Sequence, residues 1–231
     1  MGVDKFYLYD GRVQTLTCDL RRHIFGDINI NQYEQVFAGT NEGFNEVWWF
    51  YCSASSSTID RYVVYNYLEK IWYYGSMGRT AWIDSGLREY PQAATYSYNL
   101  VNHEFGVDDN VSGVPVPIEA YIESAEFDIE DGEHFGFVWR MLPDLTFQGS
   151  TAATPQVTMT LYGMNGSGSG LNQEAAKAVA RTSTATIEQF TNIIYTRVRG
   201  RQMIMKIGSS GLGTTWQLGA PRIDIRPDGR R

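Results

Sequence analysis

Ionisable and nucleophilic side chains that could perform chemistry are scattered along this 231-residue chain. His23, His103 and His134 are far apart in sequence, and Cys18 and Cys52 are separated by 34 residues. Metal binding and nucleophilic catalysis need such groups to converge in space, and the spacing gives no sign that they do. Motifs of phosphate-binding loops, hydrolase elbows and zinc proteases do not occur. We therefore predict that the protein is not an enzyme, with no catalytic, cofactor-binding or metal-binding residues.

Carboxylates are concentrated between residues 119 and 133, where seven acids occur without a base. Calcium binds carboxylate and carbonyl oxygens, so this run and residues 108–110 are candidate Ca²⁺ ligands. The acids alternate with apolar residues and lack EF-hand spacing, which favours an exposed acidic face of a sheet. A pair such as Asp128 and Glu130 would also suit the acid and base of a glycosidase.

Arginines recur on alternate positions at residues 197, 199 and 201. On a β-strand alternate side chains point the same way, so these guanidinium groups would form a one-sided basic stripe. Such a stripe fits either phosphates or the acidic strand of a neighbouring subunit. Because the net charge of the chain is −7, we favour a subunit contact. The candidate interface residues are Arg197, Arg199, Arg201, Glu123, Glu126 and Asp128.

Charge is divided unevenly between the two ends of the chain. Residues 181–231 carry nine basic and three acidic side chains, a balance of +6, and residues 1–180 carry ten basic and 23 acidic ones, a balance of −13. This asymmetry predicts an electrostatic seam between copies of the protein or a surface that repels polyanions. The simpler alternative is that these charges occupy solvated strand faces.

Composition predicts the kind of element that must position these groups. The chain is 43% apolar, 19% charged and 14% aromatic, which excludes a disordered protein and favours strands. We predict an all-β fold, an aromatic-rich, partially propeller-like β-meander followed by a β-sandwich. Its predicted parts are a meander domain at residues 1–110, a linker at 111–117 and a sandwich domain at 118–231.

Turn signals define the individual strands. Asp10-Gly11 between residues 5–9 and 12–16 is a strong hairpin signal. The Asp, Gly and Pro content of residues 106–117 indicates a domain boundary. Residues 31–37 are a helix candidate, and residues 173–181 indicate a helical turn or a mobile excursion. The remaining strands are predicted at residues 46–51, 61–65, 70–74, 94–100, 101–105, 118–129, 135–142, 144–147, 156–162, 193–199, 202–207, 216–219 and 222–226. A turn is predicted near Asn99, between the strands at 94–100 and 101–105, and a Gly/Ser loop at 163–170.

Two segments together resemble a known family. Residues 197–203 and 216–231, the latter reading WQLGAPRIDIRPDGRR, resemble the C-terminal end of tailed-bacteriophage tail proteins of the nozzle or packaged-DNA stabilisation type. Residues 47–75 are similar to a propeller-like blade of that family. The resemblance implies a structural virion protein, assembled in the host cytoplasm as a homo-oligomeric ring, with a hexamer favoured. Its implied partners are other tail and adaptor proteins and genomic double-stranded DNA, which passes through the channel without specific binding until ejection.

Two other classes of function stay open. The first is a carbohydrate-binding or glycan-degrading protein that uses Trp48, Trp72, Tyr73 and nearby carboxylates on host-surface sugars. The second is a β-scaffold with a Ca²⁺ site near Asp108. No apolar run approaches the roughly 20 residues of a membrane span, and the N-terminus lacks a secretory signal, so we expect no membrane insertion.

Overall fold

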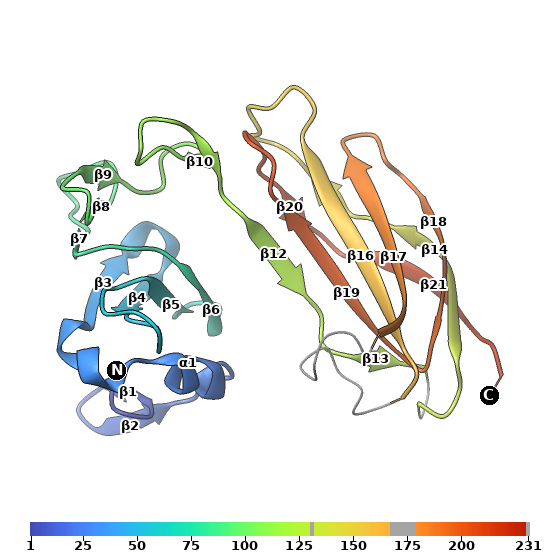
Figure 1. The fold of residues 1–231 in the computed structure, drawn as a ribbon, viewed down its shortest axis with the longest axis horizontal. Helices are drawn as coiled ribbons and strands as arrows, with labels where there is room; N and C mark the ends of the chain where they lie inside the picture. The colour runs from blue at the N-terminus through green and yellow to red at the C-terminus, as the bar shows by residue number, and fades with distance from the viewer. Residues whose placement is uncertain (130–131, 167–178, 230–231) are drawn as a thin grey trace. The chain divides into compact units, whose positions relative to one another are not determined.

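The computed structural model describes residues 1–129, 132–166 and 179–229. Antiparallel strands make up most of the regular structure, which confirms the predicted all-β fold class. The chain forms two compact units, an N-terminal unit of Met1–Phe105 and a C-terminal unit of Gly106–Arg231 (Figure 1).

The N-terminal unit is built from a hairpin, short helical segments and two sheets. The four-stranded sheet has the order β3-β4-β5-β6, so each strand pairs with the next along the chain, as in the predicted meander. Its likeness to a propeller blade stays a prediction. The elements are β1 (Phe6–Tyr9), β2 (Val13–Leu16), α1 (Arg21–Asp27), the 3-10 helices η1 (Ile30–Gln35) and η2 (Glu42–Phe44), β3 (Phe37–Asn41), β4 (Glu46–Tyr51), β5 (Arg61–Asn66), β6 (Ile71–Ser76), β7 (Ala81–Ile83), β8 (Gln92–Ala94) and β9 (Leu100–Asn102).

Both faces of this four-stranded sheet are covered, which explains the run of large residues in β4. Side chains of successive residues point to opposite faces. On one face, Tyr51 and Val63 are buried together with Phe6 of β1 and Ile24 of α1. On the other face, Trp48 stacks on Trp82 of β7, with ring centroids 5.3 Å apart.

Two predictions for this unit need correction. Residues 31–37 do not form an α-helix, because η1 is a 3-10 helix that ends at Gln35 and residue 37 begins β3. The side chain of Asn29 caps η1 by accepting a hydrogen bond from the Asn31 N–H at 3.1 Å. The turn predicted near Asn99 begins earlier, at residue 95, since β8 ends at Ala94; the Thr95 hydroxyl accepts from the Asn99 N–H at 3.2 Å within this turn.

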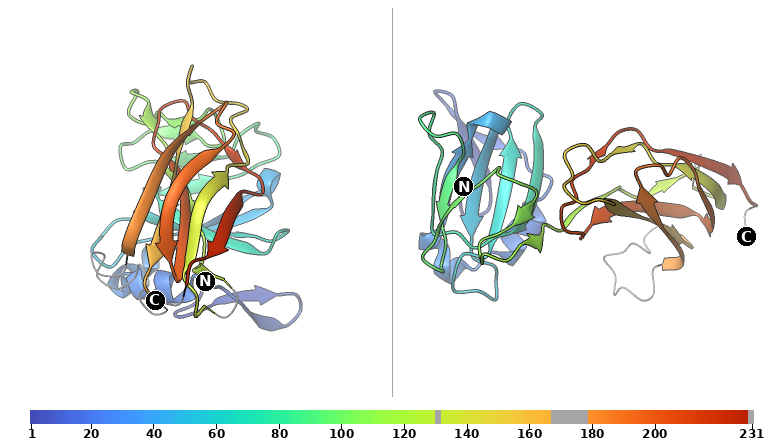
Figure 2. Two further views of the ribbon diagram at one scale, coloured as in Figure 1. Left: turned by 90° about the vertical axis from the view of Figure 1, so that its right-hand side faces the viewer. Right: turned by 90° about the horizontal axis from the view of Figure 1, so that it is seen from above.

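The C-terminal unit is built around two antiparallel sheets that face each other, with two further strand pairs, β10-β11 and β15-β20. The larger sheet has the order β12-β19-β16-β17 with β13 also on β19, and the smaller one has the order β18-β14-β21. Figure 2 shows these strands from two further directions. The elements are β10 (Asp108–Asp109), β11 (Val116–Pro117), β12 (Ala120–Glu123), β13 (Phe127–Asp128), β14 (Gly136–Leu142), β15 (Leu145–Thr146), β16 (Gln156–Met164), β17 (Val179–Glu188), β18 (Ile194–Gly200), β19 (Gln202–Ser209), β20 (Gln217–Leu218) and β21 (Arg222–Pro227).

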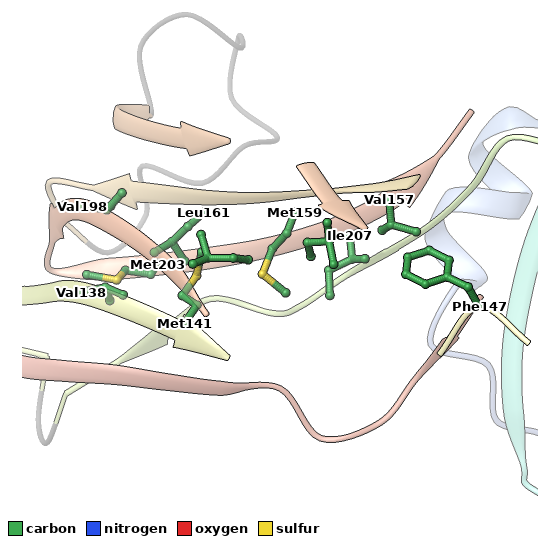
Figure 3. Close-up of a cluster of buried hydrophobic side chains, with 11 residues drawn as sticks. Val138, Met141, Phe147, Val157, Met159, Leu161, Val198, Met203 and Ile207 are labelled. Atoms are coloured by element: carbon green, nitrogen blue, oxygen red, sulfur yellow. The ribbon is translucent and has the colours of Figure 1, made fainter. Parts of the chain in front are cut away.

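The core of the C-terminal unit lies between these two sheets. Val138 and Met141 of β14 point from the smaller sheet toward Met159 and Leu161 of β16 (Figure 3). All four side chains are at most 1% exposed. This shared apolar layer is what holds a sandwich together.

The segment predicted as a linker, residues 111–117, is part of a folded hairpin. Val116 pairs with Asp109, which makes β11 the partner of β10. The carboxylate oxygens of Asp108 lie 2.8 and 3.0 Å from the main-chain N of Gly213, which donates to them and ties the hairpin to the C-terminal unit. Asp, Gly and Pro mark turns as well as linkers, and here they mark a turn.

The chain between β16 and β18 also differs from the prediction. β16 continues to Met164, and residues 179–181 belong to strand β17, which pairs with β16. Residues 167–178, which include parts of the predicted Gly/Ser loop and of the helical turn predicted at 173–181, lie outside the described residues.

Candidate interaction surfaces

The outward face of the smaller sheet is rich in arginine. Side chains alternate along β18, so Val198 is buried and Arg197 is exposed. The strand register extends this face across the sheet, because Phe137 of β14 stands opposite both Arg199 and Arg226. We call this surface the arginine face. It consists of Tyr195, Arg197 and Arg199 on β18, Phe137, Trp139 and Arg140 on β14, and Arg222, Asp224 and Arg226 on β21.

Aromatic rings lie beneath several guanidinium groups of the arginine face. The guanidinium of Arg140 is 4.7 Å from the centroid of Trp139, and that of Arg226 is 5.1 Å from the centroid of Phe137. The register of β14 shifts between Val138 and Arg140, and the consecutive residues Trp139 and Arg140 therefore both face outward. A guanidinium placed over a ring can still donate N–H groups to a carboxylate, and Arg140 does so, since its Nε donates to Asp224.

The three arginines predicted to form one stripe have different environments. Arg197 and Arg199 share the outward face of β18, and Arg201 directly follows the end of that strand. Arg199 is engaged within its own unit, since its Nε donates to the Asp228 carboxylate at 2.6 Å. The guanidinium groups of Arg199 and Arg201 lie 3.9 and 5.1 Å from the ring centroid of Phe135.

The acidic candidates lie on the other sheet. Glu123 of β12 is 3.7 Å from the ammonium of Lys206, which itself lies 4.2 Å from the ring centroid of Tyr121. Glu126, which precedes β13, and Asp128, which lies within it, are both exposed. We call Glu119, Glu123, Glu126 and Asp128 the acidic edge, because they lie along the β12–β13 side of the larger sheet. Glu130 and Asp131 lie outside the described residues.

Some charges on both surfaces have no counter-charge. In the part of the chain that the structure describes, Arg197 and Arg222 form no ion pair, and the same holds for Glu126 and Asp128. Sequence reasoning did not include Arg222 and Arg226 among the candidates. The signal was available, because Arg and Asp alternate with Ile through residues 222–226.

A cluster of buried polar side chains occurs in the N-terminal unit. The carboxylate of Glu46, which is 8% exposed, accepts hydrogen bonds from Trp48 Nε1 at 3.0 Å, from Asn41 Nδ2 at 3.3 Å and from the Tyr73 hydroxyl. Asn41 Nδ2 also donates to Glu104 at 3.0 Å. The donors to Glu46 are therefore side chains of the same unit, which indicates a structural role for this carboxylate.

Burial and neighbouring charge shift the titration of this cluster. Glu104 is exposed as a residue, but its carboxyl end lies against Asn41, and burial of that end together with the nearby Glu46 carboxylate raises its pKa. The pKa of Tyr73 is raised far above its ordinary value by burial and by the hydrogen bond to Glu46. Both shifts favour the neutral form of the group.

The aromatic residues considered for sugar binding do not form one platform. Trp48 and Tyr73 belong to one face of the four-stranded sheet, with Trp48 6% exposed, whereas Trp72 packs on the opposite face with Phe6 and Trp49. Trp72 lines a cavity of the N-terminal unit.

The groups considered for metal chemistry have other partners. His103 Nε2 accepts a hydrogen bond from Arg79 Nε at 3.0 Å, and Asp108 binds a main-chain N–H as described above. Within the described ranges, no three His, Cys, Asp or Glu side chains gather as they would around a metal ion. Both cysteines are free thiols.

No helix among the described residues is both long and apolar enough to cross a bilayer. Comparison with protein-family models and with curated protein sequences found no match to this chain.

Proposed function

We propose that this chain is a structural protein whose copies associate head to tail into a closed ring. The observation that carries the proposal is the separation of charge in the C-terminal unit, with the arginine face on one sheet and the acidic edge on the other. A head-to-tail ring requires two different, complementary patches on each subunit, and these two surfaces meet that requirement.

The chemistry of the two surfaces suits a specific contact. Arg197 and Arg222 have no ion pair among the described residues, and their counterparts across the contact would be Glu126 and Asp128. Paired guanidinium and carboxylate groups form strong, directional hydrogen bonds. Charges that are unsatisfied within one subunit would be satisfied between two.

The resemblance to tail nozzle proteins suggests where such a ring would act. In this part of the proposal the ring is a component of a phage tail in the virion, with six copies favoured, docked on other tail proteins. Genomic DNA would pass through its channel without specific binding, since the chain has a net charge of −7 and a negative surface repels phosphate. The proposed role is mechanical and contains no catalytic step.

Charge reversal tests the contact. We expect the double variant Arg197→Glu/Arg222→Glu to weaken self-association at least about thirtyfold, which corresponds to about 2 kcal/mol for the loss of close charge pairs. The double variant Glu126→Arg/Asp128→Arg should have the same effect, and an equimolar mixture of the two variants should associate again. Mass photometry and light scattering of the full chain measure these outcomes.

Arg22→Glu is the matched control. Arg22 is exposed on α1 of the N-terminal unit and belongs to neither surface, so its reversal should leave the oligomer unchanged. A wild-type chain that stays monomeric at every concentration would contradict the proposal. Oligomers that form equally well in all variants would contradict the assigned contact.

A further inference from the structure

A pocket of about 330 Å³ lies on the N-terminal unit, lined by residues of the β1–β2 hairpin, of the segment that follows it, of β5 and β6, and of the turn between these two strands. Its aromatic lining consists of Tyr65 and Trp72, which stand opposite each other in the β5–β6 register with ring centroids 4.6 Å apart. The polar lining residues are Gln14, Thr15, Thr17, Asp19 and Lys70.

The aromatic lining is held in place by its surroundings. The Trp72 ring contacts Phe6 and Trp49, with centroids 4.6 and 5.8 Å away, and its Nε1 donates to the Thr17 carbonyl oxygen at 2.9 Å. A ring fixed on several sides loses little conformational entropy when a ligand binds against it.

Several polar lining residues have hydrogen-bond donors or acceptors without a partner in the described part of the chain. In the described part of the chain, the side chains of Asp19 and Lys70 form no hydrogen bond and no ion pair, and both residues are exposed. Gln14 donates through Nε2 to Asp10 at 2.9 Å, which leaves its Oε1 as an acceptor. A carboxylate, an ammonium, an amide oxygen and threonine hydroxyls thus border one aromatic surface.

We infer that this pocket binds a neutral pyranose sugar. A pyranose ring has an apolar C–H face, which would pack on Tyr65 and Trp72, and a rim of hydroxyl groups. Adjacent hydroxyls can donate to the carboxylate of Asp19 and accept from the ammonium of Lys70. The two opposite charges cancel, which favours a neutral ligand, and a cavity at the small end of the usual range for ligand sites suits a single sugar ring.

This inference does not depend on the proposed ring. The pocket belongs to the N-terminal unit, and the proposed contact belongs to the C-terminal unit. Loss of sugar binding would therefore leave self-association intact, and loss of self-association would leave sugar binding intact. The two experiments have separate readouts.

Titration of the full chain with simple sugars tests the inference. The probes are the methyl glycosides of glucose and galactose and N-acetylglucosamine, with glucuronic acid as a charged comparison. We expect at least one neutral sugar to bind saturably with a Kd on the order of millimolar, more tightly than glucuronic acid. Two-dimensional NMR should show the largest shifts at the indole N–H of Trp72.

Two substitutions distinguish an effect of the pocket on sugar binding from a general effect of removing a negative charge. Asp19→Asn should weaken sugar binding about tenfold, because one charged hydrogen-bond acceptor is lost, and it should leave the melting temperature unchanged. Glu69→Gln is the matched control, since Glu69 is an exposed neighbour of Lys70 that does not line the pocket. The inference is overturned if none of the neutral sugars binds saturably, if Asp19→Asn binds as the wild type does, or if Glu69→Gln weakens binding equally.

Discussion

Some charged side chains have hydrogen-bond or ion-pair partners within their own unit, and others have none among the described residues. Glu46 accepts hydrogen bonds from three side chains of its own unit, and Arg199 is bound to Asp228. Arg197 and Glu126 have no such partner among the described residues. A satisfied buried charge stabilises one fold, whereas an exposed unsatisfied one is available to another molecule.

The carboxyl group of Glu104 leads to a prediction about pH. Its pKa in the folded state lies above the ordinary value of 4.5, so over the interval between these two values the folded state binds more protons than the unfolded state. The contribution of Glu104 to the free energy of unfolding is therefore fully present below pH 4.5 and is lost as the pH rises through the folded-state pKa. Glu104→Gln removes the ionisation and keeps an acceptor for Asn41.

We therefore expect Glu104→Gln to be more stable than the wild type at neutral pH, by a margin that shrinks as the pH falls to about 4. Urea denaturation of both proteins across this pH range measures the margin. A pH profile identical to that of the wild type would contradict the assigned cause. Glu69→Gln, at an exposed position, serves as the control.

At the scale of elements, Phe6 is the fully buried anchor of the β1–β2 hairpin, and its partner Leu16 packs against the same core. Gly11 in its turn has φ = 101°, a conformation that suits glycine. Phe6 is 1% exposed, whereas Tyr9 of the same strand is 75% exposed. A two-stranded hairpin alone is marginally stable, so packing of Phe6 against the four-stranded sheet must hold it.

Phe6→Ala should lower the free energy of unfolding of the N-terminal unit by about 3–5 kcal/mol, the usual loss for a fully buried phenylalanine. Tyr9→Ala in the same strand should change it by no more than about 0.5 kcal/mol, since that ring lies in solvent. Chemical denaturation followed by tryptophan fluorescence compares the two. Equal effects would show that the anchor lies elsewhere in the hairpin.

At the scale of the whole molecule, each unit has its own core. The core of the C-terminal unit lies between its two sheets, and that of the N-terminal unit lies on both faces of its four-stranded sheet. Each unit is also long enough to bury a core of its own. We infer that neither unit needs the other in order to fold.

Residues 1–105 and 106–231, expressed separately, should each fold. The expected result is strand-type circular dichroism, well-dispersed NMR spectra and a cooperative denaturation transition for both fragments. A fragment that is unfolded while the full chain is folded would show that its core is completed by the other unit.

Much of the fold could be predicted because local signals and tertiary contacts agree. Asp10-Gly11 indicated the first hairpin, and strands were predicted at 46–51 and 222–226, close to β4 and β21. Helix α1 was not predicted, since its seven residues bury a single side chain, Ile24, and show no period. Strand β17 was missed because Thr, Ser and Ala fill most of it, and pairing with β16 supplies the strand.

The amino-acid sequence alone determined the fold class, most strand positions and the division of charge along the chain, because turn residues, β-branched residues and charges act locally. Only the tertiary structure decided which charges are already paired. Arg199 meets Asp228 across 29 positions, and Glu46 meets Tyr73 across 27. Such partners are brought together by strand register and sheet packing, which depend on the whole unit, so no local pattern could distinguish an occupied guanidinium from an available one.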